Sequence, residues 1–473
     1  MTELVIDNNK NSKKVSPMEN QQEDYEKLPP ITLFHKLTFA LLGICSLTGW
    51  NAILNAFDFF QAKFPKKNFV DVAFYFPIPI MCTNFLVGIC LTIVGNKIPI
   101  EKRIPFSLRG AVFTLVSICL VGIYLKYTQA GMALVFIILI LQGTFDSLTT
   151  NSSIALSGAT QSGELIGIFW TFTAWSGVIM NILRFIALGA FGIEDLDNGT
   201  GLYFGVATGF YIIGSICITI FTNCDYYKAV LRRDKMRNLK LQQQKQADSE
   251  KDMFKMQDNQ IVINNENQQQ TAQQLQTAQK ILTNQQIQTA NQFDVNNNQK
   301  TSNLNKVINF FIIIGPAPFF IFMTYVQTFM LFPGVSVFQK PKYTLIEFPY
   351  ALVFMFTIYN IGDLVGKSLG SVSLFKKQWI AYIEVLSRFT FYIFFLLIAK
   401  KQGSLQMQND VFQFFLLFMF ALTNGMITSI LMALAPQRAT NAKDRDLICY
   451  MSAFSLNFGI AIGSFMALTL SNN

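Results

Sequence analysis

Long apolar stretches alternate with short polar ones along most of the chain. Eleven stretches are about 20 residues long, which is the length a helix needs to cross the hydrocarbon core of a bilayer. They are Leu37–Phe57, Val72–Val94, Ile104–Leu125, Ala130–Ile154, Leu165–Phe191, Leu202–Phe221, Val307–Phe332, Phe348–Leu369, Trp379–Ala399, Val411–Leu434 and Leu447–Leu470. The fourth is the least regular because Asp146–Ser153 is polar, so its helix is expected to end at Ile154 or several residues earlier. This pattern predicts an all-α polytopic membrane protein with eleven transmembrane helices.

The amino-acid composition fits a protein that is surrounded by lipid. Of 473 residues, 51% are hydrophobic and only 14% are charged, whereas soluble proteins carry about 25% charged residues. The single histidine, His35, excludes a site of several histidine ligands or a histidine-based catalytic triad. The seven cysteines lie in or beside apolar stretches without short-spaced pairs, as buried apolar cysteines do. We therefore predict no metal site, no cofactor and no enzymatic activity.

The net charge of +9 suggests nucleic-acid binding only until the positions of the charges are considered. Lys and Arg gather in the loops between apolar stretches, with twenty on the side of the N-terminus and eight on the other side. By the positive-inside rule the N-terminus is cytoplasmic and, after eleven spans, the C-terminus is extracellular. We expect the plasma membrane, with an intracellular membrane as the alternative, and no nucleic-acid partner.

The chain divides into two groups of spans and two polar segments. Residues 1–36 form a cytoplasmic tail, residues 37–221 hold six spans, and residues 307–473 hold five. Between them, residues 222–306 are expected to be a disordered cytoplasmic loop, because Leu241–Lys300 contains 18 Gln and few apolar residues. A short amphipathic helix within this loop is the alternative. Two helical groups that face a central path are typical of transporters.

Ionisable side chains inside apolar spans are the first candidates for function, because lipid makes them costly. In the eighth span, Phe356, Asn360, Asp363 and Lys367 are spaced by four, three and four residues and therefore share one helical face. Asp363 and Lys367 can neutralise each other at rest, and each can bond a polar solute. A purely structural ion pair is the alternative.

Two further spans carry candidate binding residues. In the fourth span, Gln142 and Asp146 share a face, and a glutamine side chain offers both a donor and an acceptor for the edge of a heterocycle. An interhelical hydrogen bond is the alternative for this glutamine. In the first span, Trp50 and Asn51 lie in mid-helix, where an inward-facing indole suits a flat solute.

Other buried charges are predicted to hold the bundle together. Arg184 in the fifth span and the pair Glu384 and Arg388 in the ninth are interpreted as interhelical locks or gating salt bridges. Asp146 belongs with them if Arg184 or Lys367 supplies its counter-charge. If neither does, Asp146 is a candidate for coupling solute movement to protons.

Several motifs in the spans resemble those of one transporter family. In chain order they are LTGWN (47–51), LQGTF (141–145), ILRFI (182–186), MLFPGVSV (330–337), YNIGDLVGKSL (359–369), SRF (387–389), NGMITSILMALAPQR (424–438) and GIAIG (459–463). Together they make the chain similar to the equilibrative nucleoside transporter family, except in the N-terminal tail and the Gln-rich loop. The resemblance implies a major-facilitator-like 6+5 bundle that moves nucleosides, and sometimes nucleobases, by alternating access and facilitated diffusion.

The resemblance also assigns roles to residues that match the motifs. Trp50 and Leu54 would line the base, Gln142 would read its edge, and Ile460 would pack nearby. Asp363 and Lys367 would hold the ribose hydroxyls. Phe356 and Asn360 would form the same wall.

The chain departs from the family pattern at four places. Gly49 replaces a proline, Asp146 replaces a nonpolar residue, and Lys367 replaces an arginine, which keeps the charge but loses the planar fork. Ser162-Gly163-Glu164 replaces a glycine-glutamine-glycine motif. These departures leave open a carrier of nucleobases or another small polar solute, with or without proton coupling. A receptor or scaffold that uses the Gln-rich loop is an alternative of another class, and the oligomeric state stays open.

Overall fold

The computed structural model describes residues 28–94, 98–160, 162–233, 235–236, 312, 314–338, 344–348, 350–401, 407–438 and 442–471. The chain forms two compact units, residues 1–32 with 221–292 and residues 33–220 with 293–473, each described by itself. In the first unit, residues 225–233 are helical. The Gln-rich stretch and the tail before residue 28 lie outside the described residues, as do their predicted disorder and amphipathic helix.

Helices make up all of the regular structure in the part of the chain that the structure describes. Their bounds are α2 (Leu33–Asn55), α3 (Phe57–Lys63), α4 (Val72–Tyr75), α5 (Pro77–Val94), α6 (Ile100–Tyr124), α7 (Gln129–Thr160), α8 (Gly163–Phe191), α9 (Leu196–Asn223), α12 (Ala317–Leu331), η3 (Gly334–Phe338), α13 (Tyr350–Ser371), α14 (Gln378–Ser387), α15 (Phe389–Ala399), α16 (Asp410–Leu434), η4 (Ala435–Arg438) and α17 (Ala442–Ser471). Within these residues, eleven helical segments are long and apolar enough to cross a membrane. The predicted all-α fold with eleven spans is confirmed.

Short polar side chains begin several of these helices. The Asp71 carboxylate accepts a hydrogen bond from the Ala73 N–H ahead of α4, and Asn409 accepts one from Val411 at the start of α16. Ser162 caps α8 in the same way. Each cap pairs an N–H that has no partner within its helix, so these residues fix where the spans begin.

The fourth span is longer than the sequence indicates. We expected its helix to end at Ile154 or earlier, but α7 continues to Thr160. The polar segment is helical because neighbouring spans take up its hydroxyl groups: Ser147 donates to the Asn84 carbonyl at 2.8 Å and Thr150 to the Ser46 carbonyl at 3.0 Å. Thr149 bonds the hydroxyl of Ser107 at 2.9 Å. The polarity of this segment therefore marks contact with α5, α2 and α6 rather than a loop.

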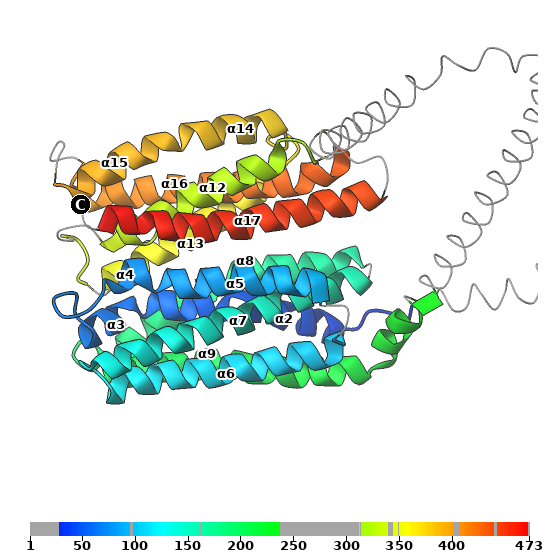
Figure 1. The fold of residues 1–473 in the computed structure, drawn as a ribbon, viewed down its shortest axis with the longest axis horizontal. Helices are drawn as coiled ribbons and strands as arrows, with labels where there is room; N and C mark the ends of the chain where they lie inside the picture. Colours follow the sequence, from blue (N-terminus) through cyan, green and yellow to red (C-terminus); the bar gives the residue numbers. More distant parts are fainter. Residues whose placement is uncertain are drawn as a thin grey trace, which may run out of the picture. The chain divides into compact units, whose positions relative to one another are not determined.

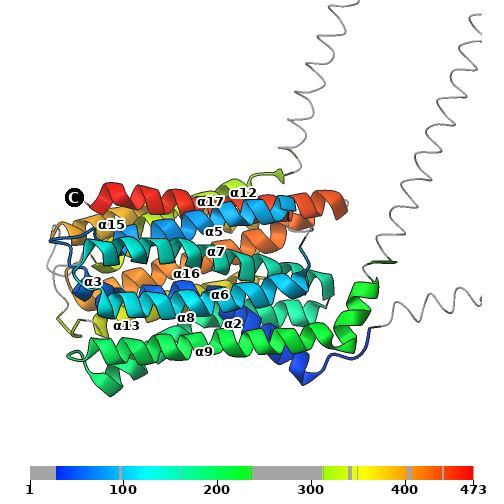
Figure 2. The ribbon, with the colours of Figure 1, turned by 60° about the horizontal axis from the view of Figure 1, so that its bottom comes forward.

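The spans of the second unit form two groups (Figures 1 and 2). In the first group α2 packs on α7 and α8, and α7 also contacts α5 and α6. In the second group α13 packs on α16, and α12 packs on α17. The groups meet where α13 contacts α8 and where α17 contacts α5. This arrangement is a six-plus-five bundle in which two helical halves face each other.

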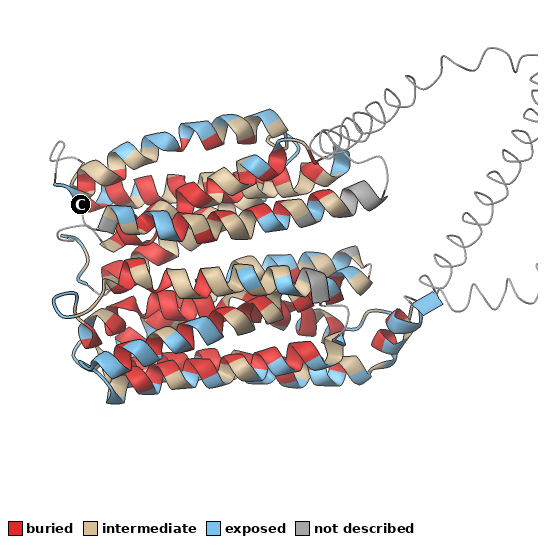
Figure 3. Ribbon diagram, viewed as in Figure 1, coloured by how far each residue is buried: buried red, intermediate tan, exposed pale blue. Residues whose placement is uncertain are grey.

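Large apolar side chains are exposed on the outer faces of the spans. Phe106 and Phe113 on α6 and Ile213 on α9 are each more than half exposed. Figure 3 shows exposed positions recurring along these helices, while buried positions lie on their inner sides. Such a surface requires acyl chains as its surroundings, so the chain is an integral membrane protein.

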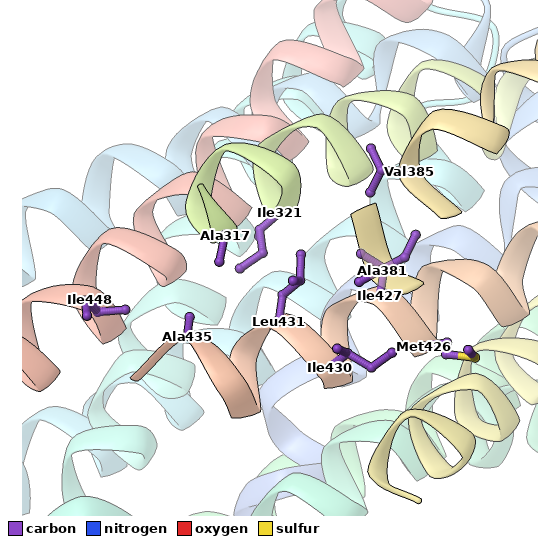
Figure 4. Packing of buried hydrophobic residues seen from close by; sticks show 10 residues of the cluster. All are labelled: Ala317, Ile321, Ala381, Val385, Met426, Ile427, Ile430, Leu431, Ala435 and Ile448. Carbon is purple, nitrogen blue, oxygen red and sulfur yellow. The ribbon is translucent and has the colours of Figure 1, made fainter. Parts of the chain in front are cut away.

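The second half has a compact apolar core (Figure 4). Ala317 and Ile321 of α12 pack with Ala381 and Val385 of α14 and with the α16 ridge that includes Ile427. Small and branched side chains interlock here, which holds α12, α14 and α16 at close range. These three helices carry the polar network described below.

A stripe of glycines lets α13 approach α16 closely. Gly362, Gly366 and Gly370 follow one another at intervals of four residues and are all buried. A Cβ at Gly366 would overlap the Leu422 carbonyl oxygen, and one at Gly425 on α16 would overlap the Asp363 carbonyl oxygen. Stripes of small residues are a common means of packing membrane helices. Here the stripe lies on the helix that carries the Asp363–Lys367 pair.

We predict that Gly366→Ala lowers the stability of the protein by about 1–3 kcal/mol, because the added methyl group forces two backbones apart. The measurement is the thermal unfolding midpoint of purified protein in detergent. Gly205→Ala is the matched control, because a Cβ at Gly205 meets nothing within 4 Å. Equal midpoints for the two variants would show that the contact between α13 and α16 is not tight.

Candidate functional site

The Asp363–Lys367 pair on α13 is the centre of the candidate site. The Lys367 Nζ lies 2.6 Å from Asp363 Oδ2, and both side chains keep some exposure, 36% for the lysine and 15% for the aspartate. Asp363 Oδ1 accepts a further hydrogen bond from Asn424 Nδ2 of α16 at 2.8 Å. The pair is thus held in place by a neighbouring helix while part of it stays accessible to a solute.

A hydrogen-bonded relay connects this pair to a buried arginine. Arg388 lies at the junction of α14 and α15 and is fully buried. Its guanidinium donates to the Phe420 carbonyl at 2.7 Å and to the Thr423 hydroxyl at 2.6 Å. It also donates to Thr328 Oγ1 at 2.7 Å, and that hydroxyl lies 2.8 Å from Asn424 Oδ1. The relay therefore runs from α15 through α12 and α16 to Asp363 on α13.

The relay determines how the Asn424 amide is oriented. An ionised carboxylate only accepts hydrogen bonds, so the amide must turn its NH₂ group to Asp363. Its oxygen then faces Thr328, as observed. Thr328 and Asn424 are thus positioning residues that sequence reasoning missed. The available signal was the presence of an amide and a hydroxyl inside otherwise apolar spans.

The predicted pairing of Glu384 with Arg388 is not seen. No ion pair joins them in the described part of the chain; the guanidinium instead bonds the neutral groups of the relay and lies 4.2 Å from the ring centroid of Phe420. Glu384 is half-buried on α14. Arg388 joins α15 to α12 and α16, as an interhelical lock does, but without an acidic partner.

The other two residues of the α13 stripe have different surroundings. Phe356 is fully buried, with its ring 5.6 Å from that of Phe332 and 6.3 Å from that of Phe338. Asn360 is half-buried, and its amide lies against Gly177 of α8, where a Cβ would approach its Cγ to 2.6 Å. Asn360 therefore lies where the two halves meet, whereas Phe356 packs inside the second half.

The apolar candidates of the first and last spans have different surroundings. The Trp50 indole of α2 lies 6.0 Å from the ring of Phe329 on α12, so an aromatic pair bridges the halves. Leu54 lies one turn further along α2 and is almost fully buried. Ile460 is half-buried on α17, next to Gly459, which packs closely against the Phe322 carbonyl of α12.

Gln142 lies inside the first half, and both the oxygen and the nitrogen of its amide are hydrogen-bonded. Its oxygen accepts a short hydrogen bond from the Thr114 hydroxyl of α6, and its nitrogen donates to Asp146 Oδ1 at 2.8 Å. Tyr211 of α9 donates to the same carboxylate oxygen at 3.2 Å. Asp146 Oδ2 is buried without a hydrogen-bond partner. Asp146 makes no ion pair within the described residues.

Gly49 on α2 lies directly against the side chains of Gln142 and Asp146. A Cβ at Gly49 would overlap Gln142 Nε2 and would lie 2.7 Å from Asp146 Oδ1. Gly49 and Asp146 are both departures from the family pattern, and the structure brings them together. The absence of a side chain at Gly49 provides the space that the Gln142–Asp146 pair occupies.

Arg184 has a partner other than Asp146. Its guanidinium lies 2.6 Å from Asp58 Oδ2 of α3 and 3.0 Å from the Thr200 hydroxyl, and it faces the ring of Tyr203. Both charged side chains are fully buried. Since Lys367 pairs with Asp363, neither proposed cation neutralises Asp146. Asp58 was not among the predicted residues, because it lies just beyond the first apolar stretch, which ends at Phe57.

Comparison with known proteins identifies the family. A model of the nucleoside transporter family matches residues 134–471. The chain belongs to the nucleoside transporter family. Equilibrative nucleotide transporter 1 of Arabidopsis thaliana is 23% identical over 470 residues, which cover 95% of this chain and 89% of that protein. Equilibrative nucleotide transporter 8 of the same plant is 33% identical over 140 residues, 30% of this chain and 35% of that protein.

Solved structures of other transporters share the fold. A mutant of the nucleoside transporter NupG superposes with a TM-score of 0.51 at 12% identity, covering 93% of this chain and 92% of that one. The xylose transporter XylE from E. coli gives 0.52 at 11% identity, covering 93% and 96%. A peptide transporter POT gives 0.57 at 11% identity, covering 95% and 92%. The predicted major-facilitator-like bundle of a membrane transporter is confirmed.

We predict that Gly49→Ala destabilises the transporter, because its methyl group displaces the Gln142 amide from Asp146. Combining it with Gln142→Ala should relieve the clash, so the double variant should be at least about 1 kcal/mol more stable than the sum of the single effects implies. Thermal unfolding of the four proteins measures this coupling. Gly167→Ala, which meets nothing within 4 Å, serves as the control. Strict additivity would contradict the contact.

Proposed function

We propose that this transporter moves nucleosides across the membrane by facilitated diffusion, with the two halves alternately opening to either side. The observation that carries the proposal is the partly exposed Asp363–Lys367 pair, held by Asn424. A ribose hydroxyl both donates and accepts hydrogen bonds. The carboxylate accepts from one hydroxyl and the ammonium donates to its neighbour, which gives the pair two charge-assisted bonds to one sugar.

The base is proposed to bind at the aromatic contact between the halves. The ring centroids of Trp50 and Phe329 lie 6.0 Å apart across that contact, and a planar heterocycle is proposed to stack on the exposed aromatic faces when the halves separate. Leu54 and Ile460 contribute apolar walls on this side. Asn360, against Gly177, lies between the sugar and base regions. Gln142 reads the edge of the base only when it exchanges its bond to Asp146 for one to the solute.

The orientation of the protein follows from the distribution of its basic residues. We propose a cytoplasmic N-terminus, an extracellular C-terminus and residence in the plasma membrane, with residues 222–306 on the cytoplasmic side. A nucleobase carrier is the nearest alternative, and it would use the aromatic contact without the Asp363–Lys367 pair. A receptor or scaffold has no need of such a pair or of the relay behind it.

We predict that substitutions at Asp363 and Lys367 reduce the uptake of nucleosides more than that of free nucleobases. Asp363→Ala removes one contact and leaves the ammonium unpaired, so nucleoside uptake should fall to near background. Lys367→Ala should weaken adenosine uptake about tenfold or more and hypoxanthine uptake less, because a free base has no ribose; one charge-assisted bond is worth about 1.5–3 kcal/mol. Lys367→Arg should retain or improve adenosine affinity.

Uptake of labelled adenosine, uridine and hypoxanthine, normalised to surface protein, measures these effects. Glu164→Ala is the control, because Glu164 pairs with Lys36 at 2.6 Å where both side chains are exposed. Such pairs contribute little to stability. Wild-type uptake of adenosine by Asp363→Ala and Lys367→Ala would show that the pair is only structural.

A second candidate function is proton-coupled transport, and Asp146 is the observation that favours it. Asp146 is 3% exposed, is not neutralised by Arg184 or Lys367, and has one oxygen without a partner. The neighbouring titratable groups are Tyr211 of α9, which donates to Asp146, and the Cys45 thiol of α2. Proton uptake by Asp146 would change which hydrogen bond Gln142 makes, and so would link protonation to the base site.

We predict for this second function that wild-type adenosine uptake falls as the external pH rises from about 5.5 to about 8, because the proton-loaded carrier becomes scarce. Asp146→Asn keeps the shape but cannot change its charge, so its uptake should not depend on pH. The measurement is initial uptake across the pH range with and without a protonophore. A flat wild-type profile leaves passive transport as the function.

A further inference from the structure

A groove runs between α6 and α9, which lie side by side (Figures 1 and 2). Its volume is about 400 Å³. Arg109 and Val112 of α6 form one wall, and Ile212, Ser215 and Ile216 of α9 contribute to the other. The groove thus combines one cation and the two hydroxyl residues Ser215 and Thr219 with otherwise apolar walls.

The groove opens on the part of the surface that faces lipid. Phe106 and Phe113, on the same face of α6 as Arg109, are 62% and 63% exposed, and Ile216 and Ile220 of α9 are 55% and 54% exposed. Both helices are membrane spans. Acyl chains, rather than water or protein, are therefore the medium on this side.

Arg109 differs from the other arginines within the spans. Arg184 is paired with Asp58, and Arg388 is hydrogen-bonded to the relay. Arg109 is exposed and makes no ion pair or hydrogen bond to any described residue. A guanidinium on a membrane-facing surface without a protein partner is stabilised when it reaches the polar edge of the bilayer, where lipid phosphates are the available anions.

The depth of Arg109 matches the headgroup region of a bilayer. The apolar part of α6 begins near Ile104, so Arg109 lies five residues, or about 7.5 Å, inside it. A long basic side chain spans that distance when it snorkels. Its guanidinium then lies at the level of lipid phosphates at the end of α6 that carries Lys102.

We propose that this groove binds one anionic phospholipid. The planar guanidinium of Arg109 forms two parallel hydrogen bonds to the phosphate, and the Ser215 hydroxyl lies in the same groove. An acyl chain lies along the ridge of Ile212, Ile216 and Ile220, which recur every four residues of α9. A net negative headgroup is preferred, because a zwitterionic lipid carries its own cation.

The test uses the full-length protein, incubated in detergent with equal amounts of phosphatidylglycerol and phosphatidylcholine. Native mass spectrometry then measures which lipid stays bound after the detergent is removed. Wild type should retain phosphatidylglycerol in preference. Arg109→Gln should reduce that preference about fivefold. Arg109→Lys should keep only part of it, because lysine retains the charge but not the second parallel hydrogen bond. Lys126→Gln, which removes an exposed cation beyond the opposite end of α6, should behave as wild type.

A second variant and a competitor test the groove without removing the charge. Ile216→Trp fills the acyl site and should also reduce phosphatidylglycerol retention, even if Arg109→Gln does not fold. Excess inorganic phosphate should not displace the lipid, because it lacks acyl chains. Absence of a preference in wild type, an unchanged preference in folded Arg109→Gln or in Ile216→Trp, or displacement by phosphate would each overturn the proposal.

Discussion

The hydrocarbon core of a bilayer offers no hydrogen-bond partners, so charged side chains buried inside the bundle are stabilised by partners within the protein. That constraint explains the two arginine networks. Arg184 is neutralised by Asp58 and bonded by Thr200, which ties α8 to α3 and α9. Arg388 makes no ion pair with an acidic side chain among the residues that the structure describes, and its hydrogen bonds are distributed over α12 and α16. Each network fixes the positions of several helices with one cation.

The second network also prepares the candidate site. Because the Asp363 carboxylate only accepts hydrogen bonds, the Asn424 amide presents its NH₂ group to Asp363 and its oxygen to Thr328, which Arg388 also contacts. The glycine stripe brings α13 near enough to α16 for this bond to form. One face of α13 thus packs on α16 through its glycines, and another carries the polar side chains. A substitution on the glycine face is therefore expected to move the Asp363 carboxylate as well.

In the first half, a glycine leaves space for the buried carboxylate of Asp146. Gly49 has no side chain at the point where Gln142 and Asp146 approach α2, and Tyr211 closes the other side. Gln142 is therefore bonded to Thr114 and Asp146 in this conformation. Under the proposed function, recognition of a base by this amide would be coupled to the protonation state of Asp146, because the two side chains share a hydrogen bond.

The eleven spans could be predicted from the sequence, because the thickness of a bilayer directly sets the length and polarity of the apolar stretches that cross it. The sequence also determined the stripe of Asn360, Asp363 and Lys367, since helical periodicity alone places these residues on one face. The extent of α7 was underestimated, because polar residues that bond neighbouring spans look like a loop in one dimension. The partners of the buried polar groups became visible only in the folded protein: Arg184 pairs with Asp58, 126 positions away, and Asn424 donates to Asp363, 61 positions away. No local pattern specifies such partners, because they depend on how whole helices pack.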